Sequence, residues 1–130
     1  LIEKYFNIQQ ERDAALKALE LAIGNVKDSL IEIEIEKKES VPLVIERFLS
    51  YKTTNVLGIL LDNFSPDEAK KVITNVSHTY DVSNVVFDAS GGITKDNIAD
   101  WAETGVDILA IGEITHSVRA ADLSLEMLLE

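Results

Sequence analysis

Residues 88–94 read DASGGIT, directly follow the apolar run 85–87, and hold two of the chain's six glycines side by side. Adjacent glycines at the end of a strand cost backbone entropy, so their position needs a steric or a binding reason. Without Cβ atoms the backbone amides approach an anion closely, and a helix expected to begin at Thr94 would add its positive end. The pattern predicts a phosphate site at Ser90, Gly91 and Gly92, although the spacing fits a plain tight turn equally well.

A second glycine loop, residues 112–116, reads GEITH and follows the next expected strand. Barrels built from βα units often bind phosphate between two consecutive late loops. Gly112 and His116 are therefore further candidate phosphate contacts. The chain has two histidines and no cysteine, which argues against a dedicated zinc site.

Two carboxylates also stand near strand ends, Glu34 within the alternating run 31–36 and Asp62 directly after the apolar run 59–61. In a barrel, the isoleucines of the first run would face the helices, so Glu34 would point to the interior or the mouth. Such a pair could accept hydrogen bonds from sugar hydroxyls, hold hydrated magnesium, or stabilise a cationic sugar transition state. Alternatively, the glutamates form a solvated edge face and Asp62 caps a turn with Asn63. The residues alone favour this alternative.

Alternating helices and strands must position these residues. Helices are predicted over 9–23, 40–49, 65–78 and 94–102, and strands over 31–36, 56–61, 84–87 and 107–111. The tail from residue 119 fits a strand or a short helix. The repeated order is typical of parallel α/β sheets and barrels, whose functional residues gather at the carboxyl ends of the strands. Those ends lie near Glu34, Asp62, residues 90–92 and Gly112.

The composition narrows the class of protein. A length of 130 residues suits one domain, and no apolar run approaches the roughly 20 residues of a membrane span. The net charge of −11 opposes binding to nucleic acid, and the absence of cysteine excludes a disulfide framework. A cytoplasmic enzyme or module is expected. Because the chain begins with Leu1 and not with methionine, we expect it to be part of a longer polypeptide.

Several segments together resemble one family. ASGGIT, ETGVD and THSVRAADLSL resemble the carboxy-terminal part of quinolinate phosphoribosyltransferase, also called nicotinate-nucleotide pyrophosphorylase (carboxylating). The family's IEVE and LDN segments have counterparts at 31–34 and 61–63, in the family's order and at nearly its spacing. Each piece alone is weak, whereas the joint match over residues 30–127 is specific.

The resemblance implies an α/β fold, in which one domain over 1–130 forms part of a TIM-like (type II phosphoribosyltransferase) barrel. The implied reaction condenses quinolinate with phosphoribosyl pyrophosphate, using Mg²⁺, to give nicotinate mononucleotide, pyrophosphate and carbon dioxide for NAD synthesis. Glu34 and Asp62 match acids that bind ribose hydroxyls and the metal-pyrophosphate region. The contacts to the 5′-phosphate match Ser90, Gly91, Gly92, Gly112 and His116.

Some positions depart from the family. Asp88 replaces its usual glutamate, and Glu113 replaces a small residue beside the expected phosphate site. Of the family's KDNH segment, an ungapped alignment retains the lysine alone, at Lys4, which we take as a third catalytic candidate. The family's amino-terminal domain and its arginine-rich substrate motifs are absent from this sequence.

Highly anionic substrates need cations that this acidic chain does not supply. In the family, a partner subunit's amino-terminal domain completes each active site, so the resemblance implies a homo-oligomer, a dimer or higher. We expect turnover within a longer chain and an inactive isolated chain. Two alternatives stay open: another phosphate-binding barrel enzyme, and a non-catalytic barrel fragment or assembly module.

Overall fold

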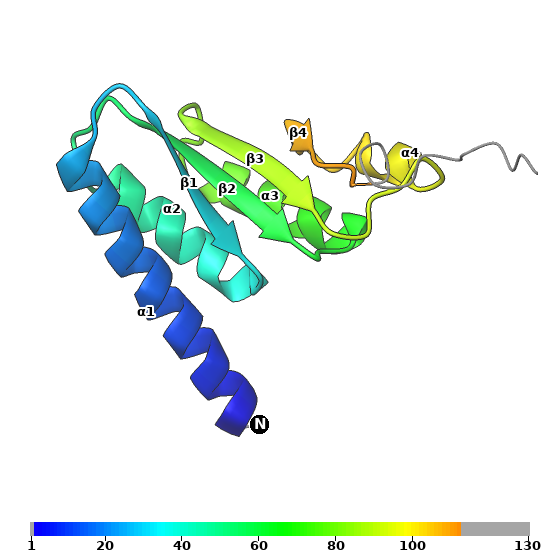
Figure 1. Cartoon of the computed structure of the whole chain (residues 1–130), viewed down its shortest axis with the longest axis horizontal. Coiled ribbons are helices and arrows are strands. Elements are labelled where there is room, and N and C mark those ends of the chain that lie inside the picture. The colour runs from blue at the N-terminus through cyan, green and yellow to red at the C-terminus, as the bar shows by residue number, and fades with distance from the viewer. Residues whose placement is uncertain (1, 113–130) are drawn as a thin grey trace, which may run out of the picture.

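The computed structural model describes residues 2–112, which form a parallel sheet with helices packed against it (Figure 1). The elements in chain order are α1 (Ile2–Asn25), β1 (Leu30–Ile35), the 3₁₀ turn η1 (Lys38–Ser40), α2 (Val41–Leu49), β2 (Val56–Asp62), α3 (Pro66–Thr79), β3 (Val85–Ser90), α4 (Ile98–Trp101) and β4 (Ile108–Leu109). This order confirms the predicted alternation and the α/β class.

The four strands pair in the order β1-β2-β3-β4, and every pair is parallel. Strand order that follows chain order is what a βα-barrel requires, whereas a doubly wound sheet reverses its order at a switch point. Four strands make an open sheet, so closure into a barrel stays a prediction. The register places Asp62 opposite Ser90, at the carboxyl ends of β2 and β3.

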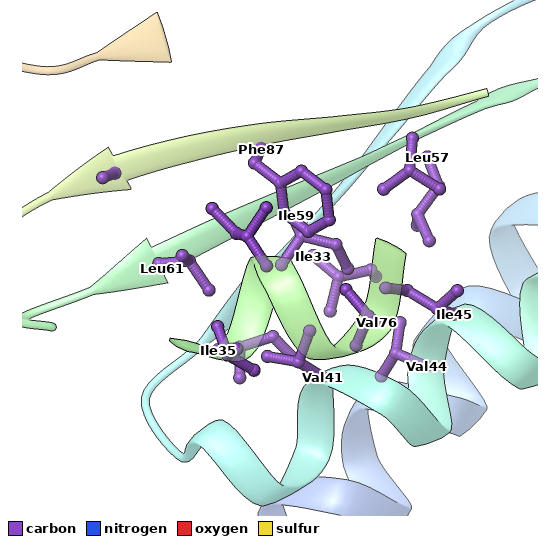
Figure 2. Packing of buried hydrophobic residues seen from close by; sticks show 14 of the residues in the cluster. Ile33, Ile35, Val41, Val44, Ile45, Leu57, Ile59, Leu61, Val76 and Phe87 are labelled. Atoms are coloured by element: carbon purple, nitrogen blue, oxygen red, sulfur yellow. The ribbon is translucent and has the colours of Figure 1, made fainter. Parts of the chain in front are cut away.

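The core lies between the sheet and the helices. Alternate residues of the strands are buried on this side, including Ile33 and Ile35 of β1 and Ile59 of β2. They pack against residues of α2 and α3 such as Val44 and Val76 (Figure 2). Each such side chain stabilises the fold by about 1.5–3 kcal/mol through removal of apolar surface from water.

The opposite face of the sheet carries acids. In β1 the buried isoleucines alternate with exposed Glu32 and Glu34, and in β2 and β3 the half-buried positions on this side include Asp62, Asp88 and Ser90. Glu34 thus lies on the face opposite the isoleucines and is exposed on the edge strand β1; that this face becomes a barrel interior stays a prediction. Because successive side chains of a strand alternate between faces, the hydrophobic pattern of β1 fixes where its acids point.

The expected start of α3 is confirmed in detail. The Ser65 hydroxyl accepts a hydrogen bond from the Glu68 backbone N–H at 3.3 Å, and the Glu68 carboxylate accepts one from the Ser65 N–H at 3.2 Å. Pro66 occupies the first turn, where its missing N–H leaves no bond unmade. The capping box thus fixes where the loop after Asp62 ends and the helix begins.

The predicted helix over 94–102 is wrong in extent. Thr94 caps no helix: its N–H donates to the Asn97 side chain at 2.8 Å, and α4 spans only Ile98–Trp101. A polar side chain that binds the local backbone competes with helix formation, and here Asn97 delays the helix. The positive helix end expected at Thr94 is therefore absent from the described structure.

Other boundaries differ by smaller amounts. The strand expected over 84–87 continues to Ser90, so the turn begins at Gly91, and the strand expected over 107–111 shortens to Ile108–Leu109. Helix α1 is longer than expected at both ends and passes through Gly24, the predicted stop. The tail from residue 119 lies outside the described residues.

A polar clamp holds the amino-terminal ends of the strands, away from the candidate site. Asn55 is 2% exposed, its amide donates to the Val26 carbonyl at 3.1 Å, and its carbonyl accepts from the Ser29 N–H at 3.0 Å. This division agrees with βα architectures, which place stability at one end of the strands and function at the other. Within residues 2–112, no helix combines the length and the apolar character needed to cross a bilayer.

Candidate functional site: an acidic rim and a glycine turn

The carboxyl ends of β2 and β3 are joined by side chains as well as by the sheet. The Ser90 hydroxyl donates to Asp62 Oδ1 at 3.0 Å, and the Asn63 amide donates to Asp62 Oδ2 at 2.9 Å. The Asn63 backbone N–H donates to the Ser90 carbonyl at 2.9 Å. Both oxygens of Asp62 are thereby oriented, which is how a site holds a carboxylate ready for a ligand.

The two glycines of the turn have different reasons to be glycine. Gly91 has φ +89°, and a Cβ there would overlap the Asn63 side chain, with Cγ at 2.8 Å and the backbone N at 2.9 Å. Gly92 has φ +66°, and a Cβ there would meet nothing within 4 Å. Positive φ favours glycine at both positions, and crowding by Asn63 is a second reason at Gly91 only. The open space beside Gly92 leaves room for an anion to approach the backbone.

The side chain of Asn97 forms two hydrogen bonds with the backbone of the glycine turn and the residues after it. Its side-chain amide donates to the Gly92 carbonyl at 2.9 Å, while its side-chain oxygen accepts from the Thr94 N–H. One side chain, that of the residue preceding α4, thus binds the backbone of the loop at both Gly92 and Thr94.

We call the carboxyl ends of β1, β2 and β3, with Glu34, Asp62 and the turn at residues 90–92, the rim. Three carboxylates lie close together at its β1 side. One oxygen from each of Glu34, Glu36 and Asp62 can be chosen so that all lie within 4.8 Å of one another. Mg²⁺ prefers oxygen ligands and is usually held by one or two carboxylates together with water. The predicted pair therefore fits the ion expected from the sequence, and Glu36 adds a third carboxylate.

Helix α1 borders the acidic part of the rim. A cavity of about 420 Å³ is lined by Glu34, Glu36 and Lys37 together with Gln10 and Glu11 of α1. The Glu11 carboxylate accepts a hydrogen bond from the Lys37 N–H at 3.2 Å, which ties the helix to the loop after β1. Lys37 also pairs with Glu36 at 3.3 Å.

The structure brings together Glu34, Asp62 and the Ser90 turn, as predicted. Gly112 is exposed and lies three residues beyond the end of β4, the strand next to β3. Lys4 belongs to α1, two helical turns before Glu11, and its catalytic role stays a prediction. His116 and Glu113 lie outside the described residues. The roles of all the predicted site residues remain to be tested.

Three contributing residues were missed from the sequence. From the sequence, Asn63 is predicted only as a turn partner of Asp62 and Glu36 only as part of a solvated edge face, and Asn97 has no predicted role. The signals were present: Asn63 follows a strand-end acid, Asn97 follows the glycine pair by five residues, and Glu36 continues the alternation of Glu34. Side-chain bonds across two loops depend on register, which a single sequence does not display.

The carboxyl group of Asp88 lies deeper on the same face of β3. One of its oxygens, Oδ1, is buried and has no hydrogen-bond partner within the described structure. Burial raises the pKa of Asp88 above its ordinary value, and a hydrogen bond from the Ala89 backbone partly opposes this.

Comparison with known proteins decides the family. The family model for "quinolinate phosphoribosyl transferase, C-terminal domain" matches residues 3–126. The chain belongs to this family. The resemblance read from the sequence motifs is thereby confirmed, and the match extends toward the amino end beyond residue 30.

Members of the family with assigned names agree. A probable nicotinate-nucleotide pyrophosphorylase (carboxylating) from Methanothermobacter thermautotrophicus is 31% identical over 125 residues, covering 92% of this chain and 42% of the relative. The nicotinate-nucleotide pyrophosphorylase (carboxylating) of Mycobacterium leprae is 32% identical over 111 residues, covering 82% and 38%. The chain thus spans less than half the length of these curated relatives.

A solved structure supports the fold. The chain resembles that of NadC from Streptococcus pyogenes with a TM-score of 0.52 and 22% identity, over 68% of this chain and 27% of the other. At this identity the likeness bears on the fold alone. It agrees with the parallel order of the four strands.

Proposed function

We propose that this chain supplies the ribose, metal and phosphate contacts of a phosphoribosyltransferase that forms nicotinate mononucleotide from quinolinate and phosphoribosyl pyrophosphate. The observation that carries the proposal is the meeting of Glu34, Asp62 and the Ser90 turn at one rim, in a chain of the quinolinate phosphoribosyl transferase family. The chain covers less than half of its relatives, so the complete reaction is assigned to a longer polypeptide or assembly.

In this proposal the acids act on the sugar. Glu34 and Asp62 accept hydrogen bonds from the ribose hydroxyls and stabilise the positive charge that develops on the ring as pyrophosphate departs. The bonds from Ser90 and Asn63 orient Asp62 beforehand, so little reorganisation is needed during the reaction. The same reaction would end with loss of carbon dioxide from the quinolinate adduct.

Glu34 and Asp62, joined by Glu36, would hold Mg²⁺. When bound, the ion supplies positive charge that neutralises the pyrophosphate leaving group. The backbone amides of Gly91 and Gly92 would bind the 5′-phosphate, with Gly112 and His116 closing that pocket from the next loop. Lys4 stays a candidate for a cationic contact.

The binding site for the aromatic diacid lies mostly outside this chain in our proposal. The net charge of −11 leaves too few cations to neutralise both substrates. We therefore propose a homo-oligomeric partner that supplies cations, and low or no turnover for the 130-residue chain alone. Separately, we propose that the enzyme is located in the cytoplasm.

Calorimetric titration with nicotinate mononucleotide tests the phosphate pocket. Gly112→Asp places a negative charge beside it and should weaken binding at least about tenfold, since like charges repel. Ala18→Asp, on the exposed face of α1, makes the same change in net charge and should leave the affinity unchanged. Equal affinities for Gly112→Asp and the unmodified chain would refute the phosphate assignment.

A further inference from the structure

Asp88 lies on the uncovered face of the sheet and has one buried carboxylate oxygen, Oδ1, without a hydrogen-bond partner in the described structure. It lies on β3, with Leu60 of β2 and Ile108 of β4 opposite it in the register. Both neighbours are apolar, Leu60 half-buried and Ile108 exposed, and Asp88 Oδ1 has neither solvent contact nor a hydrogen-bond partner in the described structure. The residue as a whole is only partly buried, so its carboxyl group remains within reach of the open face.

An ionised carboxyl group in an apolar environment is unfavourable unless a hydrogen bond or a cation compensates for its lost hydration. The Ala89 backbone gives the carboxyl group of Asp88 one hydrogen bond, but the oxygen Oδ1 has lost its hydration without gaining a partner. No lysine, arginine or histidine occurs in the four described strands, so the sheet itself supplies no cation. Burial raises the pKa of Asp88 above its ordinary value.

The position of Asp88 relates it to the rim. It precedes Ser90 by two residues on the same face, so it lies about 6.6 Å below the rim at 3.3 Å per residue. The Ser90 hydroxyl binds Asp62 at that rim, where we placed the phosphorylated pentose. Rotation about the terminal torsion of aspartate is broad and two-fold, so the free oxygen can turn toward a ligand.

We propose that Asp88 is a ligand-positioning residue that accepts a hydrogen bond from an O–H donor in the occupied site. Phosphate and carboxylate groups of an anionic ligand repel a carboxylate, which leaves hydroxyl donors as its partners. Two sources offer one, a ribose hydroxyl and water bound to Mg²⁺. This inference rests on the proposed function, because it requires a pentose or its metal at the rim.

The test is calorimetry on the 130-residue chain with two separate probes, ribose 5-phosphate alone and Mg²⁺ alone. Asp88→Ala removes the acceptor and should weaken binding of one probe at least about tenfold, whereas Asp88→Asn keeps one acceptor oxygen and should lose less. A loss confined to ribose 5-phosphate assigns the donor to the sugar, and a loss confined to Mg²⁺ assigns it to bound water. Asp100→Ala, an exposed aspartate of α4, is the matched control and should change neither.

Thermal unfolding separates positioning from a structural role. Asp88→Asn removes a buried charge without changing the side chain's size, so Tm of the free chain should rise by roughly 3 °C. A fall in Tm, or unchanged affinity of Asp88→Ala for both probes, would overturn the inference while leaving the proposed function intact. Failure of the unmodified chain to bind either probe would overturn both.

Discussion

Gly91 and Gly92 are adjacent and both have positive φ, yet only Gly91 is crowded. The crowding comes from Asn63, whose own φ of +57° closes the turn after β2. Asn63 thus restrains the glycine turn of one strand and the catalytic candidate Asp62 of the neighbouring strand. At the scale of single residues, the rim is one connected unit of two loops.

This difference predicts unequal effects of the same substitution. Gly92→Ala should cost about 1–2 kcal/mol in the free energy of unfolding, the ordinary price of a left-handed residue. Gly91→Ala should cost at least about 3 kcal/mol, because the added Cβ also collides with Asn63. Urea denaturation measures both values. Equal costs would mean that the two loops are not packed against each other as described.

The carboxylates of the rim predict a graded effect on Mg²⁺ binding. Asp62→Ala should reduce the affinity at least about tenfold, because it removes a proposed ligand and frees Ser90 and Asn63 from their partner. Glu36→Ala should also reduce the affinity, by a smaller factor, since Glu36 is exposed. Calorimetry with Mg²⁺ measures both.

Glu20→Ala is the control for these acids. Glu20 is exposed on α1, far along the helix from the rim, and its removal makes the same change in charge. An affinity as strongly reduced in Glu20→Ala as in Asp62→Ala would show that only net charge matters, and the site assignment would fail.

At the scale of elements, β2 and α3 are coupled through the short loop that separates them. Asp62 ends the strand and Ser65 caps the helix, so only two residues lie between a proposed ligand contact and the capping box. Hydrogen bonds from the Ser65 backbone and hydroxyl lower the pKa of Glu68, with small contributions from nearby lysines.

This lowered pKa predicts a pH-dependent cap. A group whose pKa is lower in the folded state stabilises the fold above its unfolded pKa, here about 4.3. The stability gain of the unmodified chain over Glu68→Gln should therefore be full near neutrality and shrink as the pH falls below that value. Urea denaturation between about pH 6 and pH 3 measures the difference. A difference independent of pH would contradict the capping box.

The elements themselves were largely predictable from local signals. The alternation of β1 placed its isoleucines on one face, and the Ser65-Pro66-Glu68 signal located the start of α3. The failure at Thr94 has a physical cause, because the side chain of Asn97 binds the backbone where the helix was expected to begin. Local propensity does not reveal which of two such arrangements the loop adopts.

At the scale of the whole molecule, the candidate site lies at the carboxyl ends of an open sheet with one uncovered face. The helices cover the other face (Figure 1). The uncovered face carries Glu32, Glu34, Asp62 and Asp88, and the described strands contain no basic residue. In the proposed function, cations must reach this face from outside the chain. This agrees with the finding that the chain spans less than half the length of its curated relatives. The sequence predicted the rim, because strand ends converge, but not the bonds that unite it.

The most direct test of the shared rim is an NMR titration of the ¹⁵N-labelled chain with ribose 5-phosphate and Mg²⁺. We predict that the amide shift changes concentrate at residues 34–37, 62–63 and 90–94, and leave the clamp around Asn55 at the opposite end of the strands unchanged. Changes scattered over both ends of the sheet, or no saturable change at the rim, would contradict a single site for a phosphorylated pentose.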